Sequence, residues 1–495
     1  MGIIQKQAIK GTVYSYIGVV IGFFTTAILF PLMLDPDEIG LLRLLVAFAV
    51  LFAQFGSLGF YSVLNRLFPY FRKPSDKHQG FIAFAMLVSV AGFILTSIAF
   101  ELYKPVLIRN NAEDSRLLLE YLYLIIPLIF VTLFFNLFDT YNKVLYDTVL
   151  GTFLKEFLQR LLILISVSLY YFDLLSLQGF VIAYVISLTI PTLTLFVVLI
   201  YRGEITLRFD RTAFSRPVLR EMGIISAFGF IAGLGGLAVN HVDSLLVNKF
   251  LGISATGIYT IAAYFGTLIL IPSRPLIKIS TTILAESWKS NDIDNIKLVY
   301  KKSCINQAIL GILLFIGIWV NIHNIFEILP EEYRAGKYVI FFIALANVIE
   351  MSAGVSGMVI GTSKYYRLNA VFTFIFFLLI VGLNFIFIPL FGMIGAAITW
   401  TVARLVFVSI RYAFLRYKYK LEPYDYRYLL LLLIGIVSYL SVYFLPEMQN
   451  FVVDILIRSS IVLLVFSILV LSFKISEDVN KIWKNLIPGK SKDKK

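Results

Sequence analysis

Cysteine, histidine and charge are scarce in this chain of 495 residues. The single cysteine, Cys304, excludes an internal disulfide and any cysteine-rich metal site. The three histidines, His78, His241 and His323, lie far apart in the sequence and lack the spacing of metal ligands. Charged residues make up only 15% of the chain, which is too little polar surface to cover a soluble protein of this length.

Apolar residues are abundant instead. Hydrophobic residues make up 59% of the chain, and apolar runs of about 20 residues, long enough to cross a hydrocarbon layer of roughly 30 Å, recur from end to end. Strands of a membrane barrel would instead give short alternating segments. The sequence therefore predicts an all-α polytopic membrane protein with about 14 spans, at 10–34, 41–64, 81–103, 120–142, 150–172, 174–201, 223–250, 256–285, 303–326, 336–361, 367–390, 392–415, 427–446 and 452–473.

The basic residues fall on alternate connections between these spans. The loops opposite them are acidic or nearly uncharged, for example "DPDE" at 35–38 and "LPEE" at 329–332. Because a Lys and Arg bias in short loops sets orientation, both termini are expected in the cytoplasm. The formal net charge of +13 follows from this topology, so a nucleic-acid partner is not predicted. The basic connections include residues 66–77, 202–220, 289–302, 411–427 and 474–495.

The two halves of the chain repeat weakly. At an offset of 217, Leu34, Gly40, Phe48 and Leu51 correspond to Leu251, Gly257, Phe265 and Leu268. An even number of helices between paired positions keeps their orientation, which predicts two parallel six-helix lobes. The predicted organisation is an N-terminal lobe at 1–201, a basic linker at 202–222, a C-terminal lobe at 223–415, spans 13 and 14 within 416–473, and a basic tail at 474–495.

Two cations lie one helical turn apart in the apolar stretch "TLILIPSRPLIKIS", residues 267–280. A charge at bilayer depth costs about 2.5–3.5 kcal/mol, so it usually signals a partner, a cavity or a substrate. Arg274 and Lys278 share a helix face, and the prolines at 272 and 275 are expected to kink that helix. Either side chain could instead extend to the cytoplasmic interface, and both interpretations stay open.

Three further charges fall deep within predicted spans. Arg404 and Glu350 are at comparable depth, so they could neutralise each other, or Arg404 could contact a phosphate and Glu350 could couple an ion or proton. Asp243, near His241, could couple a proton or Na⁺ gradient or could hold two helices together by hydrogen bonds.

Other charges receive simpler interpretations. Arg43 and Arg458 lie near the outer ends of spans 2 and 14 and are expected to extend to the interface. Arg43 stays a candidate for substrate binding because span 2 of the first lobe is expected to line the cleft. Glu156 and Arg160, four residues apart, are expected to form an ion pair.

Three segments carry a resemblance to a known family. They are "VNHVDSLLVNKFLGISATGIYTIAAYFGTLILIPSRPLIKISTTILAESW" at 239–288, "MLDPDEIGLLRLLVAFAVLFAQFGSLGF" at 33–60 and "PLFGMIGAAITWTVARL" at 389–405. With the fourteen spans, they resemble the polysaccharide-transport branch, of the O-antigen flippase type, of the multidrug/oligosaccharidyl-lipid/polysaccharide exporter superfamily.

This resemblance implies a flippase with two six-helix lobes around a central cavity and a terminal helix pair. It would move undecaprenyl-pyrophosphate-linked oligosaccharide to the outer leaflet of the bacterial cytoplasmic (inner) membrane by alternating access, for lipopolysaccharide O-antigen and other surface polysaccharides. Implied partners are the lipid-linked substrate, membrane lipid and the polysaccharide polymerase machinery. No cofactor is implied beyond H⁺ or Na⁺ coupling.

A diphosphate head group requires cationic donors in the cavity. The candidates are Arg274, Lys278, Arg404 and Arg43, and the candidates for ion coupling are Asp243 and Glu350. The repeat maps the first three cations to Ser57, Tyr61 and Leu188, so only one lobe carries them, as expected for a single anionic head group.

Two other functions stay open. A multidrug exporter of the same superfamily would favour organic cations and should have net negative charge in its cavity. The deep charged residues of this chain are three cations and two carboxylates, which gives a net positive charge. An integral-membrane glycosyltransferase or polymerase would need a metal-binding acidic cluster or catalytic carboxylates in a sizeable outer loop, and the sequence offers only "DPDE" and "LPEE" in short loops.

Overall fold

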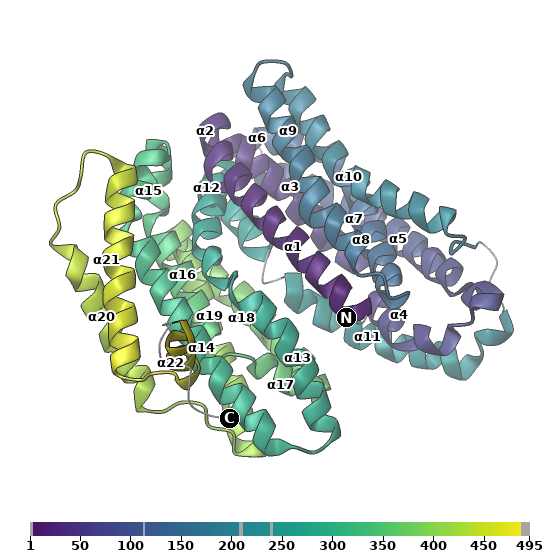
Figure 1. The fold of residues 1–495 in the computed structure, drawn as a ribbon. Helices are drawn as coiled ribbons and strands as arrows, with labels where there is room; N and C mark the ends of the chain where they lie inside the picture. Colours follow the sequence, from purple (N-terminus) through teal and green to yellow (C-terminus); the bar gives the residue numbers. More distant parts are fainter. Residues whose placement is uncertain (1–2, 112–113, 207–210, 238–240, 487–495) are drawn as a thin grey trace. The chain divides into compact units, whose positions relative to one another are not determined.

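The computed structural model describes residues 3–111, 114–206, 211–237 and 241–486, and every regular element in these ranges is helical (Figure 1). The predicted all-α class is confirmed. Parts of the predicted linker and tail, residues 207–210 and 487–495, lie outside the described residues.

The chain divides into two compact units, Met1–Ile261 with Thr373–Met393, and Ala262–Phe372 with Ile394–Lys495. These units differ from the predicted lobes, whose boundaries stay a prediction. The first unit holds α1 (Ile3–Phe23), η1 (Phe24–Leu29), α2 (Phe30–Met33), α3 (Pro36–Gly56), α4 (Phe60–Phe71), η2 (Pro74–Gly80), α5 (Phe81–Asn111), α6 (Arg116–Glu120), η3 (Leu122–Leu124), α7 (Ile125–Val144), α8 (Val149–Thr152), η4 (Phe153–Leu158), α9 (Gln159–Tyr171), α10 (Leu177–Tyr201), η5 (Arg211–Ala213), α11 (Arg216–Leu237), and most of α12 (Asp243–Thr267) and α18 (Tyr366–Phe391).

The second unit is built around α14 and the terminal helix pair. Buried side chains of α14, α20 and α21 form one apolar cluster that includes Ile309, Ile434 and Phe466. The elements of this unit are η7 (Leu268–Leu270), α13 (Ser273–Lys289), α14 (Ile293–Val320), α15 (Ile322–Ile328), η8 (Glu331–Gly336), α16 (Lys337–Ser352), α17 (Ser356–Thr362), α19 (Met393–Tyr419), α20 (Tyr426–Tyr443), α21 (Phe451–Ser472) and α22 (Glu477–Leu486).

Thirteen helices among the described residues are long and apolar enough to cross a membrane, against about fourteen predicted. The predicted span at 150–172 is not one of them. It is helical throughout, as α8, η4 and α9, but it carries Lys155, Glu156 and Arg160 close together. The chain is a multi-pass membrane protein.

Predicted spans 7 and 8 meet at Gly252, inside α12. Gly252 has φ 84° and ψ −178°, which is a turn between two helical segments. A side chain at this residue would be strained by the positive φ, and its Cβ would lie 2.9 Å from the Cβ of Asp114. The backbone N–H of Ile253 donates to the carbonyl of Asp114 (3.2 Å), so the turn is fixed by a neighbouring loop.

Two glycines next to this turn make a reciprocal contact. A Cβ on Gly40 would lie 2.2 Å from the carbonyl oxygen of Ile253, and a Cβ on Gly257 would lie 1.9 Å from the carbonyl oxygen of Pro36. Both contacts are too short for any side chain, so α3 and the second segment of α12 pack backbone to backbone. Gly40 and Gly257, and likewise Pro36 and Ile253, are separated by the repeat offset of 217.

Two predicted spans are interrupted. The span predicted at 256–285 breaks after η7, and α13 restarts with Pro272 at its N-cap and Pro275 in its first turn. The span predicted at 336–361 divides into α16 and α17, with Gly354 between them at φ 56°. At this second break the backbone N–H of Val355 donates to the Ser303 hydroxyl of α14 (3.2 Å).

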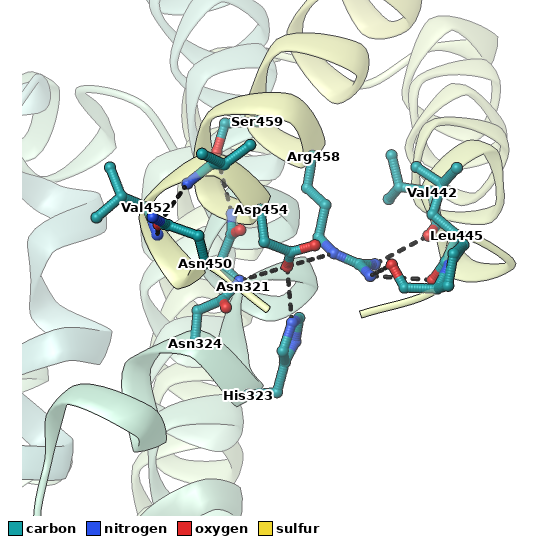
Figure 2. Close-up of polar contacts among 12 residues, drawn as sticks. Asn321, His323, Asn324, Val442, Leu445, Asn450, Val452, Asp454, Arg458 and Ser459 are labelled. Carbon is teal, nitrogen blue, oxygen red and sulfur yellow. Dashed lines mark hydrogen bonds and ion pairs between the residues drawn. The ribbon is translucent and has the colours of Figure 1, made fainter. Parts of the chain in front are cut away.

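Arg458 does not extend to the interface, so that prediction is wrong. Its side chain is buried, and its Nε donates to Oδ2 of Asp454 (2.7 Å), one turn earlier in α21 (Figure 2). Its other two nitrogens donate to the carbonyls that end α20, those of Val442, Leu445 and Pro446, at 3.0–3.1 Å. Arg458 therefore fastens α21 to the end of α20.

Candidate functional site

Asp243 lies at the start of α12 and is almost wholly buried. Its Oδ1 accepts a hydrogen bond from Nδ2 of Asn384 in α18 (2.8 Å), and its Oδ2 accepts one from the Tyr259 hydroxyl (3.1 Å). Tyr259 lies beyond the Gly252 turn, so the carboxylate joins both segments of α12 to α18. The helix-to-helix bonding expected as one alternative is present, and both donors are neutral.

Arg43 of α3 points toward the same cluster. Its Nε donates to the hydroxyl of Ser244 (2.8 Å), the buried neighbour of Asp243. The guanidinium and the Asp243 carboxylate are close enough to interact electrostatically. The expectation that Arg43 extends to the interface is therefore wrong, because it has polar partners inside the first unit.

Arg404 and Glu350 form the ion pair that was expected as one of the two alternatives. Arg404 Nη1 lies 3.2 Å from Oε2 of Glu350. The same oxygen also accepts from Nη2 of Arg411, at 2.6 Å. Arg411 was expected in a cytoplasmic connection, but it is only 5% exposed and belongs to the interior of the second unit.

The arginines of this cluster, called the Glu350 cluster below, are held on one face of α19. They are seven residues apart, or two helical turns, and each lies over an aromatic ring one turn earlier. The Arg404 guanidinium lies 5.0 Å from the Trp400 ring centre, and the Arg411 guanidinium lies 4.2 Å from that of Phe407. Such stacking fixes the plane of a guanidinium and leaves its edge for hydrogen bonds.

Arg274 and Lys278 have a different environment. Both side chains are exposed on α13, and within the described ranges neither forms a side-chain hydrogen bond or an ion pair. The helix α13 packs against α14, and it is not one of the thirteen candidate spans. Their depth in the membrane stays a prediction, and no hydrogen-bond or ion-pair partner for either side chain is found in the described part of the chain.

Glu156 and Arg160 form the predicted ion pair (2.7 Å). Arg160 also donates to the carbonyl of Gly18 in α1, where the backbone of α1 lies against η4. The pair therefore satisfies itself and fastens α1 to η4, and it has a structural explanation that needs no ligand.

Several polar residues of these clusters were missed by sequence reasoning. Asn384 is one of few polar residues in the long apolar helix α18, and this isolation is a signal that could have identified it. The spacing of Arg404 and Arg411, two turns on one face, could have identified Arg411. No comparable signal joins Tyr259 to Asp243, because their contact depends on the Gly252 turn.

Comparisons with known proteins agree with this fold. No family model matches the chain. A curated relative, an uncharacterized membrane protein of Methanocaldococcus jannaschii, is 20% identical over 97% of this chain and 99% of its own length.

Solved structures place the fold among transporters. The structure of lipid II flippase MurJ in an inward closed conformation matches with a TM-score of 0.72 and 15% identity, over 94% of this chain and all of that chain. An inward-facing multidrug resistance MATE family transporter of the MOP superfamily matches with a TM-score of 0.63 and 15% identity, over 80% of this chain and 94% of its own.

A third structure is a MOP superfamily transporter from Pyrococcus furiosus, described as having a binding pocket of reverse polarity that suggests a different function. It matches with a TM-score of 0.56 and 14% identity, over 84% of this chain and 96% of its own. The chain therefore has the fold of MurJ and the MATE transporters, and all three of these neighbours are transporters or flippases.

Proposed function

We propose that this protein flips a polyprenyl-diphosphate-linked oligosaccharide, of the undecaprenyl type, from the cytoplasmic to the outer leaflet by alternating access. The observation that carries the proposal is the pair Arg274 and Lys278. Two exposed cations in an apolar segment, with no carboxylate partner among the described residues, require an anion or water in their place. A lipid-linked diphosphate supplies that anion at that depth.

The distribution of carboxylates supports an anionic substrate over the cationic drugs of a multidrug exporter. Asp243 is buried and holds two hydrogen bonds, and Glu350 is engaged by two arginines. Neither carboxylate is presented to a cationic ligand, whereas Arg274 and Lys278 are exposed. The deep charges open to a ligand on α13 are thus positive.

Asp243 is our candidate for H⁺ or Na⁺ coupling. Its carboxylate accepts hydrogen bonds from two neutral groups, so binding of a proton or a small cation would change the net charge around Asp243. Arg43 of α3 donates a hydrogen bond to Ser244, the neighbour of Asp243, and would thereby couple this change in charge to the position of α3. We expect Asp243→Asn to retain substrate binding and to lose the dependence of transport on an ion gradient.

The remaining assignments follow from the same hypothesis. The protein would act in the bacterial cytoplasmic membrane with both termini inside, and it would deliver its substrate to a polysaccharide polymerase or ligase. Cysteine labelling of a single introduced cysteine in the 474–486 segment, from either side of sealed vesicles, would test the orientation.

The test of function is flipping in liposomes. We would reconstitute the purified full chain with a fluorescent undecaprenyl-diphosphate oligosaccharide and measure its transfer between leaflets for wild type, Arg274→Ala and Lys278→Ala. Lys289→Ala is the matched control, because Lys289 is an exposed cation in the last turn of the same helix. Transfer by wild type and the control, lost in Arg274→Ala, is the expected result. Transfer of a cationic dye with none of the lipid-linked glycan would contradict the proposal.

A further inference from the structure

The Glu350 cluster holds more positive charge than its own carboxylate neutralises. Arg404 and Arg411 share one oxygen of Glu350, so two guanidiniums face one carboxylate. Among the described residues, the charged groups that act on Glu350 are these two arginines of α19. Tyr300 and Cys304 of α14, and Tyr424 after α19, lie near Arg411. An excess of buried positive charge is costly, so this cluster favours the binding of an anion.

The unmatched donors lie on Arg411. Its Nε is buried and has no hydrogen-bond partner within the described residues, and the same holds for the hydroxyl of Ser356 at the start of α17. The residue after Ser356 is Gly357, where a Cβ would lie 2.9 Å from Nη1 of Arg411. The missing side chain at Gly357, in the first turn of α17, therefore leaves the space that the Arg411 guanidinium occupies.

The cluster is accessible from outside the second unit through Glu350. The Glu350 side chain is 25% exposed, while the side chains of Arg404 and Arg411 are each 6% exposed. Of the three side chains, that of Glu350 is therefore the most exposed to solvent. Helices interrupted within the membrane are where transporters commonly build their substrate sites, and this cluster lies at such an interruption.

From this geometry we propose that Arg404 and Arg411 form a second binding site for the diphosphate group, with Glu350 as an internal competitor that a phosphate oxygen displaces. This inference rests on the proposed function and adds Arg411 to its substrate contacts. Two guanidinium forks, with planes fixed by Trp400 and Phe407, match the geometry of phosphate oxygens. A diphosphate diester also carries the negative charge that the cluster lacks.

The test is direct binding to the purified full chain in phospholipid-free detergent, measured by calorimetry. The probes are farnesyl diphosphate, inorganic pyrophosphate and uncharged farnesol. Farnesyl diphosphate should bind, and farnesol should not. Binding of pyrophosphate as well would show that the site reads the free anion; binding of farnesyl diphosphate alone would show that it needs the lipid.

The variants change affinity in opposite directions. Glu350→Gln keeps the shape of the side chain and removes the competing charge, so affinity for farnesyl diphosphate should rise about tenfold. Arg411→Ala should lower it at least about tenfold, and Arg411→Lys, which keeps the charge and loses the fork, should lower it several-fold. Arg160→Ala removes a guanidinium from another ion pair and should leave affinity unchanged.

A cluster with a purely structural role would behave differently. Glu350→Gln would then weaken or leave unchanged the binding of every probe, and either result overturns the inference. Should Arg411→Ala fail to fold, Arg411→Lys and Glu350→Gln still decide it. Flipping by wild type with binding insensitive to Arg411 would remove only this inference, whereas Arg411-dependent binding with no flipping of any lipid-linked glycan would remove the proposed function.

Discussion

Two buried ionic clusters of the second unit invite comparison. In one, Asp454 pairs with Arg458, and in the other Glu350 is shared by Arg404 and Arg411. Charge is balanced one to one in the first cluster and two to one in the second. Oδ2 of Asp454 also accepts from Asn324 (2.7 Å) and contacts Nε2 of His323 (2.8 Å), so the helix α15 is tied in as well (Figure 2).

The difference separates a structural network from a site. All three nitrogens of Arg458 donate hydrogen bonds, whereas Nε of Arg411 has no partner in the described part of the chain. A matched and hydrogen-bonded pair fixes helices in place, and an excess of buried charge is a cost that a ligand can remove. The predictions below test whether the two clusters differ in this way.

The largest effect is expected at the balanced cluster. Arg458→Met leaves Asp454 as an unpaired buried carboxylate and frees three backbone carbonyls, so it should destabilise the protein by about 3–5 kcal/mol. Thermal unfolding in detergent would measure this as a large fall in Tm or as loss of folded protein. A Tm within a few degrees of wild type would show that the network contributes little.

A smaller loss is expected when only a neutral donor is removed. Asn324→Leu deletes the 2.7 Å hydrogen bond to Asp454 and keeps the ion pair with Arg458. The expected cost is about 1–3 kcal/mol, measured by the same unfolding assay. The matched control is Asn295→Leu, because Asn295 donates a part-buried hydrogen bond to the Ser287 hydroxyl of α13, with no charged group involved, and its loss should cost less.

The unbalanced cluster should respond with the opposite sign. Arg411→Met removes the surplus charge and leaves Glu350 paired with Arg404, so the protein should be as stable as wild type or more stable by roughly 1 kcal/mol. Transport should fall all the same. Equal destabilisation by Arg411→Met and Arg458→Met would erase the contrast between the clusters.

The smallest effect is expected at the partly exposed contact of Asp478 with Lys302 and Asn306. Burial raises the pKa of Asp478 in α22, but hydrogen bonds from Lys302 and Asn306 outweigh it and hold the pKa below its ordinary value. Because the folded-state pKa is lowered, this contact stabilises α22 at neutral pH and is lost as pH falls through that pKa. The protection factors of the α22 amides, which correct for intrinsic exchange at each pH, should fall at low pH in wild type and be independent of pH in Asp478→Asn.

Much of the architecture could be predicted because hydropathy and turn residues act locally. The apolar runs indicated the spans, and the prolines at 272 and 275 indicated the break before α13. Glu156 and Arg160 could be paired because four residues on a helix bring side chains together. Asp454 and Arg458 are also four residues apart, so the same rule could have paired them, but Arg458 was expected to extend to the interface instead.

The rest depended on contacts between distant segments. Arg411 lies where hydropathy ends a predicted span, and its partners, Glu350 of α16 and the backbone at Gly357 of α17, lie more than 50 residues away in the sequence. Arg43 has a partner, Ser244, that is 201 residues away. For such residues the sequence gives the cost of burying a charge, while the partner that offsets it appears only in the folded chain.

The reciprocal contact of Gly40 and Gly257 has a further consequence. Residue 40 meets 253 while 257 meets 36, and this exchange of partners is the pattern of an isologous interface between two identical subunits. A half-length ancestor that paired with its own copy would have needed one glycine to serve both sides of the contact. If two such copies had fused, each glycine would have become a separate position, and the backbone-to-backbone contact would have required both to be kept.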